Sequence, residues 1–350
     1  MSALGGPAGR VATAPLAVPR RAAQRRRWFA ALLAATLLPL AGLPLVALLD
    51  LPFRESTVIG LAVFIGGVCH VGSTATFYAD ADARRLMAPM KPRFVVLPLA
   101  AIAVSVVAVV AGGALGSGPG MLGDAVMAIF FVHLVWLYYH YQKQNYGLMS
   151  FAAAASGTRL PPGTVRIVLV PPLAGGLATI PALLADGLAL PLPAWLAEQA
   201  PLWRTLAWWA YAVAAVLMVR LAWRHREVFR QPLVAVFSAA SFGFFLPALL
   251  VENLDYAFWS YALAHGFQYL LMVGIVSRGA ARPLAVLPAF VGAALAGGWA
   301  LSRFGGNHAL FVCGILLTWV HFVLDARLWK MSDAAVRSFL RGRFAFIFER

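Results

Sequence analysis

Charged residues are scarce in this sequence of 350 residues: Asp, Glu, Lys and Arg together make up 12%, and only 13 residues are acidic. Apolar residues make up 62% of the chain, and its mean hydropathy is +0.80. Because a soluble domain carries about one quarter charged residues, this balance excludes an ordinary soluble fold. We therefore expect an all-α, polytopic integral membrane protein.

Cysteine is also scarce, and several common enzyme motifs are absent. Cys69 and Cys313 lie in apolar runs and fit neither a zinc motif nor a disulfide framework, so we expect each to be a small core residue. The chain contains no phosphate-binding P-loop, dinucleotide fingerprint, G-x-S-x-G elbow or H-E-x-x-H zinc helix. It thus offers none of the common signatures of nucleotide binding or hydrolysis.

Long apolar runs dominate the chain instead. Each covers roughly 18–24 residues, which is about the length that crosses a bilayer. We predict ten membrane-spanning helices: Trp28–Leu49, Ser56–Tyr78, Phe94–Leu115, Asp124–Tyr146, Thr164–Ala185, Trp203–Trp223, Leu233–Val251, Tyr256–Val276, Leu284–Leu301 and Ala309–Leu328. Residues 1–27 are expected to be a disordered basic cytoplasmic tail, 28–330 the transmembrane domain, and 331–350 a basic cytoplasmic C-terminal tail.

The basic residues predict the orientation of these helices. With the N-terminus inside the cell, all 28 Lys and Arg residues except Arg54, Arg204 and Arg303 fall on the cytoplasmic side. This bias follows the positive-inside rule, and one miscounted helix would destroy it. We therefore predict cytoplasmic termini and a multi-pass protein of the cell inner (plasma) membrane. The net charge of +15 then reflects topology and contact with membrane lipids, and no nucleic-acid partner is expected.

Polar residues within the apolar runs are the main functional signal. Five of the seven histidines lie in the second, fourth, eighth and tenth spans, all of which run inward. At about 1.5 Å per residue, these histidines lie between mid-membrane and the cytoplasmic surface. Ionisable groups at that depth are costly and mark functional sites. The predicted metal ligands are His70, His133, His140, His265, His321 and Asp325.

The ligand types and spacings indicate which metal would bind. Nitrogen and carboxylate ligands suit iron, zinc or manganese better than copper(I), which prefers sulfur. His133 and His140 are roughly 10 Å apart along their helix, which favours two ions or two layers of one site. We expect two iron ions, with His133 and His265 in the deeper layer. The shallower layer is expected to contain His70, His140 and His321 with Asp325.

The neighbouring polar residues have weaker assignments. Any single buried histidine is as often a satisfied core residue as a ligand, so the prediction depends on the whole set at one depth. Asp80 reaches the site only if its helix breaks near Gly72 or Tyr78, and it is otherwise a solvated loop carboxylate. Residues predicted to support the ligands or bind substrate are Gln144, Asn145, Gln268 and Tyr269.

The histidine pattern resembles that of membrane-embedded non-haem iron oxygenases. This class includes fatty-acid desaturases and hydroxylases and Brp/Blh-type carotene dioxygenases. The resemblance covers the five histidines and Asp325 on four helices, and it is to the class as a whole. It implies oxygen as co-substrate, a lipid or other hydrophobic small molecule as substrate, and an unidentified electron donor. The expected function is di-iron hydroxylation, desaturation or cleavage of a lipophilic substrate.

Two other functions are consistent with the same residues. Paired histidines could hold haem in an electron carrier, or serve a quinone-reactive one. Histidines with Asp325 could instead relay protons or pass a metal ion in a transporter. A transporter needs a polar path across both membrane halves, and the predicted outer half has acidic residues only near its edges. The absence of an evident inverted repeat also disfavours a secondary transporter.

Overall fold

Helices form all the regular elements in the part of the chain that this computed structural model describes. The described residues are 18–49, 61–62, 64–100, 102–103, 107, 119–186, 198–279 and 283–348. The prediction of an all-α fold is therefore confirmed. Among these residues, two helical stretches are long and apolar enough to cross a membrane by themselves, Arg20–Leu48 and Ala200–Arg224. This result is compatible with a membrane protein.

Most predicted spans coincide with helices, although several of these helices are interrupted. The longer helices are α1 (Val18–Leu48), α7 (Pro119–Ala155), α9 (Val170–Asp186), α11 (Ala200–Arg224), α13 (Pro232–Gly243), α15 (Leu254–Val276), α16 (Pro283–Leu328) and α17 (Ala334–Arg343). The shorter ones are η1 (Phe64–Cys69), α3 (His70–Ser73), α4 (Thr76–Ala79), α5 (Ala81–Met87), η2 (Ala88–Met90), η3 (Pro92–Val96), α8 (Thr164–Val168), α12 (Arg226–Phe229), α14 (Pro247–Leu250), η4 (Ser277–Gly279) and α18 (Ala345–Phe348).

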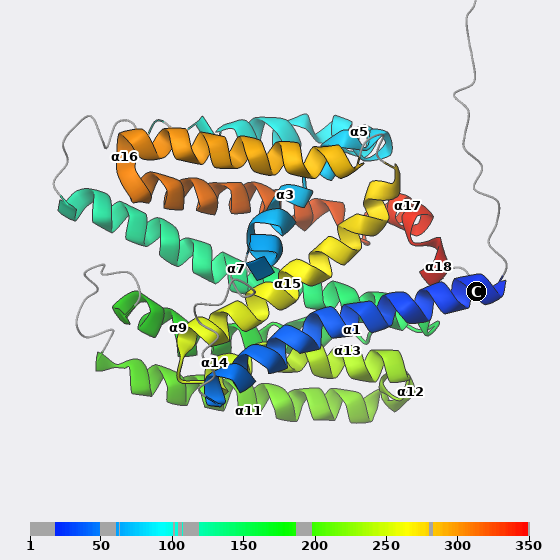
Figure 1. Ribbon diagram of the computed structural model, residues 1–350. Coiled ribbons are helices and arrows are strands. Elements are labelled where there is room, and N and C mark those ends of the chain that lie inside the picture. Colours follow the sequence, from blue (N-terminus) through cyan, green and yellow to red (C-terminus); the bar gives the residue numbers. More distant parts are fainter. Residues whose placement is uncertain are drawn as a thin grey trace, which may run out of the picture.

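Three predicted spans need a separate comment. The third, Phe94–Leu115, lies largely outside the described residues. The ninth and tenth fall within one helix, α16, because the connection expected between them is itself helical. In Figure 1 the α16 ribbon has two arms that meet at the left of the view.

The helices that carry the predicted ligands are neighbours in space. α1 packs along α15, and α11 packs along α9 (Figure 1). α7 is flanked by α9 and α13, and it also contacts α15 and α16. The short helix α3 lies against α15 and α16. α3, α7, α15 and α16 thus converge, although they come from four distant parts of the sequence.

The second predicted span is broken where it carries its polar residues. It consists of the π-helix η1, then α3, a turn at Thr74 and Ala75, and α4. Ser and Thr hydroxyls compete for backbone hydrogen bonds, and the Ser73 hydroxyl donates to the His70 carbonyl at 2.7 Å. The chain then becomes extended at Asp80, with ψ 125°. The predicted helix therefore breaks, as the sequence allowed, between Ser73 and Asp80.

Asp80 is neither a ligand nor a solvated carboxylate. Its side chain is fully buried and caps α5 by accepting a hydrogen bond from the Ala83 N–H at 2.9 Å. Its second oxygen, Oδ2, pairs with the Arg343 guanidinium at 2.7 Å. Arg343 also reaches the exposed Asp82 at 3.1 Å. The alternative of a solvated loop carboxylate is therefore wrong, because Arg343 neutralises Asp80 inside the fold.

Replacing Arg343 should be strongly destabilising. Arg343→Gln leaves the Asp80 carboxylate buried without a counter-charge, which costs about 3–5 kcal/mol. Arg85→Gln is the matched control, since it removes only the exposed pair with Asp82 and costs less than about 1 kcal/mol. Thermal unfolding of the purified variants measures both effects. Equal unfolding midpoints for the two variants would show that the buried pair stabilises the fold no more than the exposed pair does.

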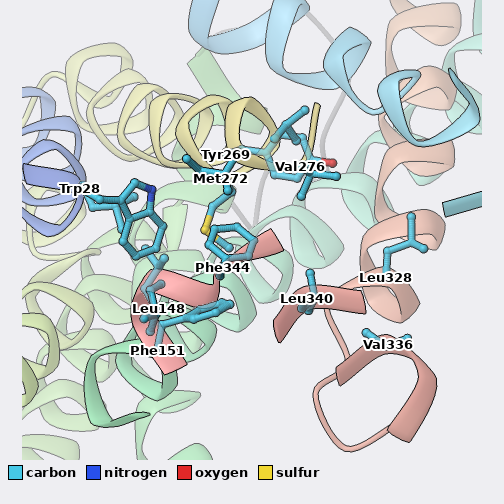
Figure 2. Close-up of a cluster of buried hydrophobic side chains, with 14 of the residues drawn as sticks. Trp28, Leu148, Phe151, Tyr269, Met272, Val276, Leu328, Val336, Leu340 and Phe344 are labelled. Atoms are coloured by element: carbon cyan, nitrogen blue, oxygen red, sulfur yellow. The ribbon is translucent and has the colours of Figure 1, made fainter. Parts of the chain in front are cut away.

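The two ends of the described chain lie in one hydrophobic cluster. α1 begins at Val18, so residues 18–27 are helical, whereas the sequence predicted a disordered segment there. Ala, Arg and Gln are strong helix formers, which accounts for this extension. The C-terminal segment is not a loose tail either. Figure 2 shows Leu340 and Phe344 packed in the cluster that contains Trp28 and Met272. Full burial of a phenylalanine such as Phe344 stabilises the fold by about 1.5–3 kcal/mol.

Candidate metal centre

Four of the five predicted histidines meet at the point where α3, α7, α15 and α16 converge. His140 lies 4.8 Å from His265 and 5.0 Å from His321, measured between ring centroids. His70 lies 5.1 Å from both His265 and His321. Asp325 follows His321 by one helical turn, with Oδ2 at 3.6 Å from His321 Nε2 and 3.8 Å from His140 Nε2. All five side chains are buried, so they form one compact cluster.

A chain of hydrogen bonds orients two of these side chains. His321 Nδ1 lies 2.7 Å from the Thr74 hydroxyl, which lies 3.1 Å from the Tyr269 hydroxyl. Tyr269 in turn donates to Asp325 Oδ1 at 2.8 Å. Each contact is satisfied when His321 Nδ1–H donates to the Thr74 hydroxyl, Thr74 donates to the Tyr269 hydroxyl, and Tyr269 donates to Asp325. It leaves His321 Nε2, which lies within hydrogen-bond distance of His140 Nε2 at 3.2 Å, and Asp325 Oδ2 as acceptors facing the cluster.

His70 is oriented in the same manner by the backbone. Its Nδ1 hydrogen-bonds the Gly66 carbonyl one turn earlier in η1. A backbone carbonyl can only accept, so Nδ1 carries the proton and Nε2 keeps its lone pair. Metal-binding histidines are typically held this way, with one ring nitrogen fixed by a hydrogen bond and the other directed at the ion.

His265 is the least satisfied polar side chain in the cluster. It is fully buried, and neither of its ring nitrogens has a hydrogen-bond partner among the described residues. The Tyr141 ring lies at 4.3 Å from its ring and the rings of His70 and His140 lie on other sides, so it is enclosed by aromatic groups. Burying polar atoms without partners costs about 1–3 kcal/mol. A bound cation would satisfy one of these nitrogens.

The distances between the donor atoms fit a transition-metal ion. Bonds of about 2.1 Å place neighbouring donors about 3.0–3.4 Å apart in octahedral or tetrahedral geometry. His140 Nε2 and His321 Nε2 are 3.2 Å apart. Donor atoms of His70, His265 and His321 lie within 4.8 Å of one another, as do those of His140, His321 and Asp325. The two groups share His321, so the five side chains form two overlapping sets of possible ligands.

His133 does not join the cluster. Its ring stacks on Phe322 at 6.0 Å and on Phe130 at 6.3 Å, and its Nδ1 accepts a hydrogen bond from the Trp319 indole at 3.2 Å. The structure therefore does not bring His133 and His265 together as the predicted deeper layer. Two helical turns separate His133 from His140, and Trp319 and Phe322 of α16 surround it with aromatic groups. The argument for two ions depended on His133 and loses its basis.

Replacing His133 should leave metal binding intact. His133→Phe keeps an aromatic ring between Phe130 and Phe322, and it removes only the hydrogen bond from Trp319. We expect metal content within about twofold of the unmodified protein, because this ring is not a ligand. His140→Phe on the same helix is the comparison, and it should lose the metal. Loss of metal from both variants would show that His133 is also needed for metal binding.

The predicted amide residues lie one step away from the cluster. Gln144 donates to the His265 carbonyl at 3.0 Å and to Gln268 Oε1 at 2.8 Å. Gln268 donates to the Thr36 hydroxyl on α1 at 2.7 Å and to Asn145 at 3.2 Å. This network joins α1, α7 and α15 and fixes the backbone that carries His265. Of the four supporting residues that were predicted, Tyr269 alone hydrogen-bonds to the side chain of a cluster member among the described residues.

A close contact between two glycines brings His70 and His265 together. A Cβ atom on Gly266 would lie 1.9 Å from the Gly66 carbonyl oxygen, so only glycine fits at this position. The same carbonyl accepts the hydrogen bond from His70 Nδ1. Gly266 directly follows His265, so one backbone contact positions both imidazoles.

Sequence reasoning missed three contributors to this site. No role for Thr74, Tyr141 or Gly266 was predicted from the sequence. Polar and small residues one turn from a histidine were the available signal for Thr74 and Gly266. No sequence signal identifies Tyr141, because its role depends on the approach of α15.

No protein-family model, curated protein or solved structure matches this chain. The resemblance to membrane oxygenases therefore rests on the histidine pattern and on the chemistry of the cluster.

Proposed function

We propose that this protein is a multi-pass inner-membrane metalloenzyme, a bundle of ten membrane-spanning helices with both termini in the cytoplasm. It binds one transition-metal ion, by preference iron, and uses oxygen to hydroxylate, desaturate or cleave a lipophilic substrate. The ligands in this proposal are His70, His140, His265, His321 and Asp325.

The buried, unpartnered nitrogens of His265 carry the proposal. The other members of the cluster have hydrogen bonds that a purely structural role would explain. His265 has none, and it lies among three imidazoles and a carboxylate. Such an arrangement is costly in a protein without a ligand and favourable in one that binds a cation. Iron bound by nitrogen and carboxylate donors supplies the oxygen chemistry of non-haem enzymes.

One ion is favoured over the two that the sequence suggested. His321 Nδ1 is engaged by Thr74, so His321 offers a single free nitrogen to both groups of donors. A single imidazole nitrogen binds one ion. Five protein ligands on an octahedral ion leave one position for a small molecule such as oxygen.

The surface supports a membrane location. Large apolar side chains are exposed along α11, among them Trp209, Val216 and Trp223, and along α1, among them Leu38 and Leu48. Polar and charged side chains such as His265 and Asp325 are buried instead. Extensive exposed apolar surface around a polar interior suits a lipid environment.

An aromatic wall beside the cluster suits a hydrophobic substrate. Phe322 packs on the His140 ring at 4.3 Å and on Trp136 at 5.4 Å. Trp136 also lies 5.9 Å from Trp319, and both indoles are only partly buried. A lipophilic molecule would reach the metal along this wall, which excludes water and presents no charge. Hydroxylation or desaturation requires an electron donor, whereas dioxygenase cleavage does not.

Packing of the four imidazoles favours an ion over a haem. Their rings meet edge to face at centroid distances of 4.8–5.1 Å, so each histidine contacts two others. Axial haem ligation requires two histidines on opposite faces of a flat macrocycle. A mutually packed cluster instead matches a small ion with several ligands.

Labelling with isotopically heavy oxygen tests the proposed reaction. Lipid extracts of cells that express the protein are compared with extracts of cells that express His265→Ala. We expect a product that carries the label, or one that has lost two hydrogens, only with the unmodified protein. A metal-loaded protein with identical extracts in both cultures would contradict the oxygenase function while leaving the metal centre in place.

A further inference from the structure

A second candidate site lies where the start of α1 meets the end of α15. It is a hollow of about 470 Å³, and none of its described lining residues belongs to the histidine cluster. α1, η4 and α18 contribute to its walls, and α18 contacts α1. The lining residues are Arg20, Ala23, Gln24, Arg27, Trp28, Ile275, Arg278 and Phe346.

Three arginines line this hollow. Arg20 and Arg27 are seven residues apart on one face of α1, with Gln24 between them, and Arg278 comes from η4. All three are exposed, and none forms an ion pair within the described part of the chain. No acidic residue is among the described residues that line the hollow. The mutual repulsion of three cations makes this position favourable for an anion.

Apolar side chains line the rest of the hollow. Trp28 is 94% buried, its exposed fraction being 6%, and its indole N–H has no hydrogen-bond partner in the described part of the chain. The Trp28 ring packs against Phe346 at 5.7 Å, and Ile275 completes the apolar lining. The site thus combines positive charge, one buried N–H donor and hydrocarbon surface. Its ligand should carry an anionic group and an apolar portion.

We propose that this hollow binds the phosphate group of an anionic membrane lipid. Arginine forms bidentate, charge-assisted hydrogen bonds with phosphate oxygens, and acyl chains would lie against the exposed apolar surface of the helices. The proposal rests on the membrane topology proposed above, which puts the start of α1 and the end of α15 at the cytoplasmic surface. Anionic lipids give that surface its negative potential.

Native mass spectrometry of the purified full-length protein tests this site. The protein is titrated separately with phosphatidylglycerol, phosphatidylcholine and inorganic phosphate. We expect retention of phosphatidylglycerol in preference to phosphatidylcholine, with no displacement by millimolar phosphate. Combining Arg20→Gln, Arg27→Gln and Arg278→Gln should weaken phosphatidylglycerol binding at least about tenfold. Trp28→Phe, which keeps the ring and removes the N–H, should weaken it about threefold.

The matched control removes three other exposed arginines. Arg159→Gln, Arg166→Gln and Arg226→Gln lower the net charge equally but lie outside the hollow. This variant should bind phosphatidylglycerol like the unmodified protein. An equal loss of phosphatidylglycerol affinity in both triple variants would show that binding depends on general surface charge, and it would overturn the proposed site. An unchanged affinity in the variant of Arg20, Arg27 and Arg278 would overturn it as well. Displacement by inorganic phosphate would assign the hollow to a soluble phosphate compound and overturn the lipid proposal. Metal content should not change in any variant, so this test is independent of the enzyme proposal.

Discussion

Gly266→Ala is expected to abolish metal binding. Its new methyl group would lie 1.9 Å from the Gly66 carbonyl oxygen, far inside contact distance. The clash involves backbone, so no side-chain rotation relieves it, and α15 and η1 must separate. That separation displaces His265 and breaks the hydrogen bond between His70 and Gly66. We expect metal content to fall at least about tenfold, measured by elemental analysis of the purified variant.

Gly274→Ala is the matched control on the same helix. A Cβ atom at Gly274 meets nothing within 4 Å, and alanine favours the helix by up to about 1 kcal/mol. This variant should keep its metal and be at least as stable as the unmodified protein. Equal metal content in the two glycine variants would show that close approach of η1 and α15 is not needed for the site.

His265→Leu is expected to separate metal binding from stability. The substitution removes a ligand, so we expect at least about a hundredfold loss of metal affinity. It also removes two buried nitrogens without partners and replaces them with apolar surface of similar size. The metal-free variant should therefore be more stable than the metal-free unmodified protein, by about 1–3 kcal/mol. Thermal unfolding in the presence of a chelator measures this difference.

Gln142→Leu is the comparison, because it removes a buried polar side chain that does have hydrogen-bond partners. Gln142 is fully buried, but its side chain donates to the Val168 carbonyl at 2.7 Å and to the Ser241 carbonyl at 3.1 Å. Its loss leaves those buried carbonyls without these donors, so the variant should be destabilised in the absence of metal. If His265→Leu destabilises the metal-free protein as much as Gln142→Leu does, His265 has a structural role and the metal proposal fails.

Much of the candidate site could be predicted from polar residues inside apolar runs. The cost of burying ionisable groups singled out His70, His140, His265 and His321 with Asp325, and the structure brings all five together. Helical periodicity could not separate His133 from His140, because both lie on one face of α7. The difference depends on Trp319 and Phe322, which α16 brings against His133. Such contacts are tertiary and leave no local trace.

The helix boundaries show a similar limit. The length of the apolar runs predicted where helices lie, but it could not predict that α3 ends at Ser73. The next residue, Thr74, hydrogen-bonds to His321, and this contact is tertiary. The C-terminal segment did carry a signal. Val336, Leu340 and Phe344 recur at four-residue intervals, which is typical of an amphipathic helix, and all three are buried. The arginines in the same segment led to the prediction of a basic tail instead.

The most direct test of the central proposal is elemental analysis of the purified full-length protein together with its optical spectrum. We predict about one iron per chain, no haem absorption band, and loss of the iron on His265→Leu. Two ions per chain would contradict the single site and restore the dinuclear centre expected from the sequence. Less than about one tenth of an ion per chain after supply of iron, zinc and manganese would contradict the metal centre itself.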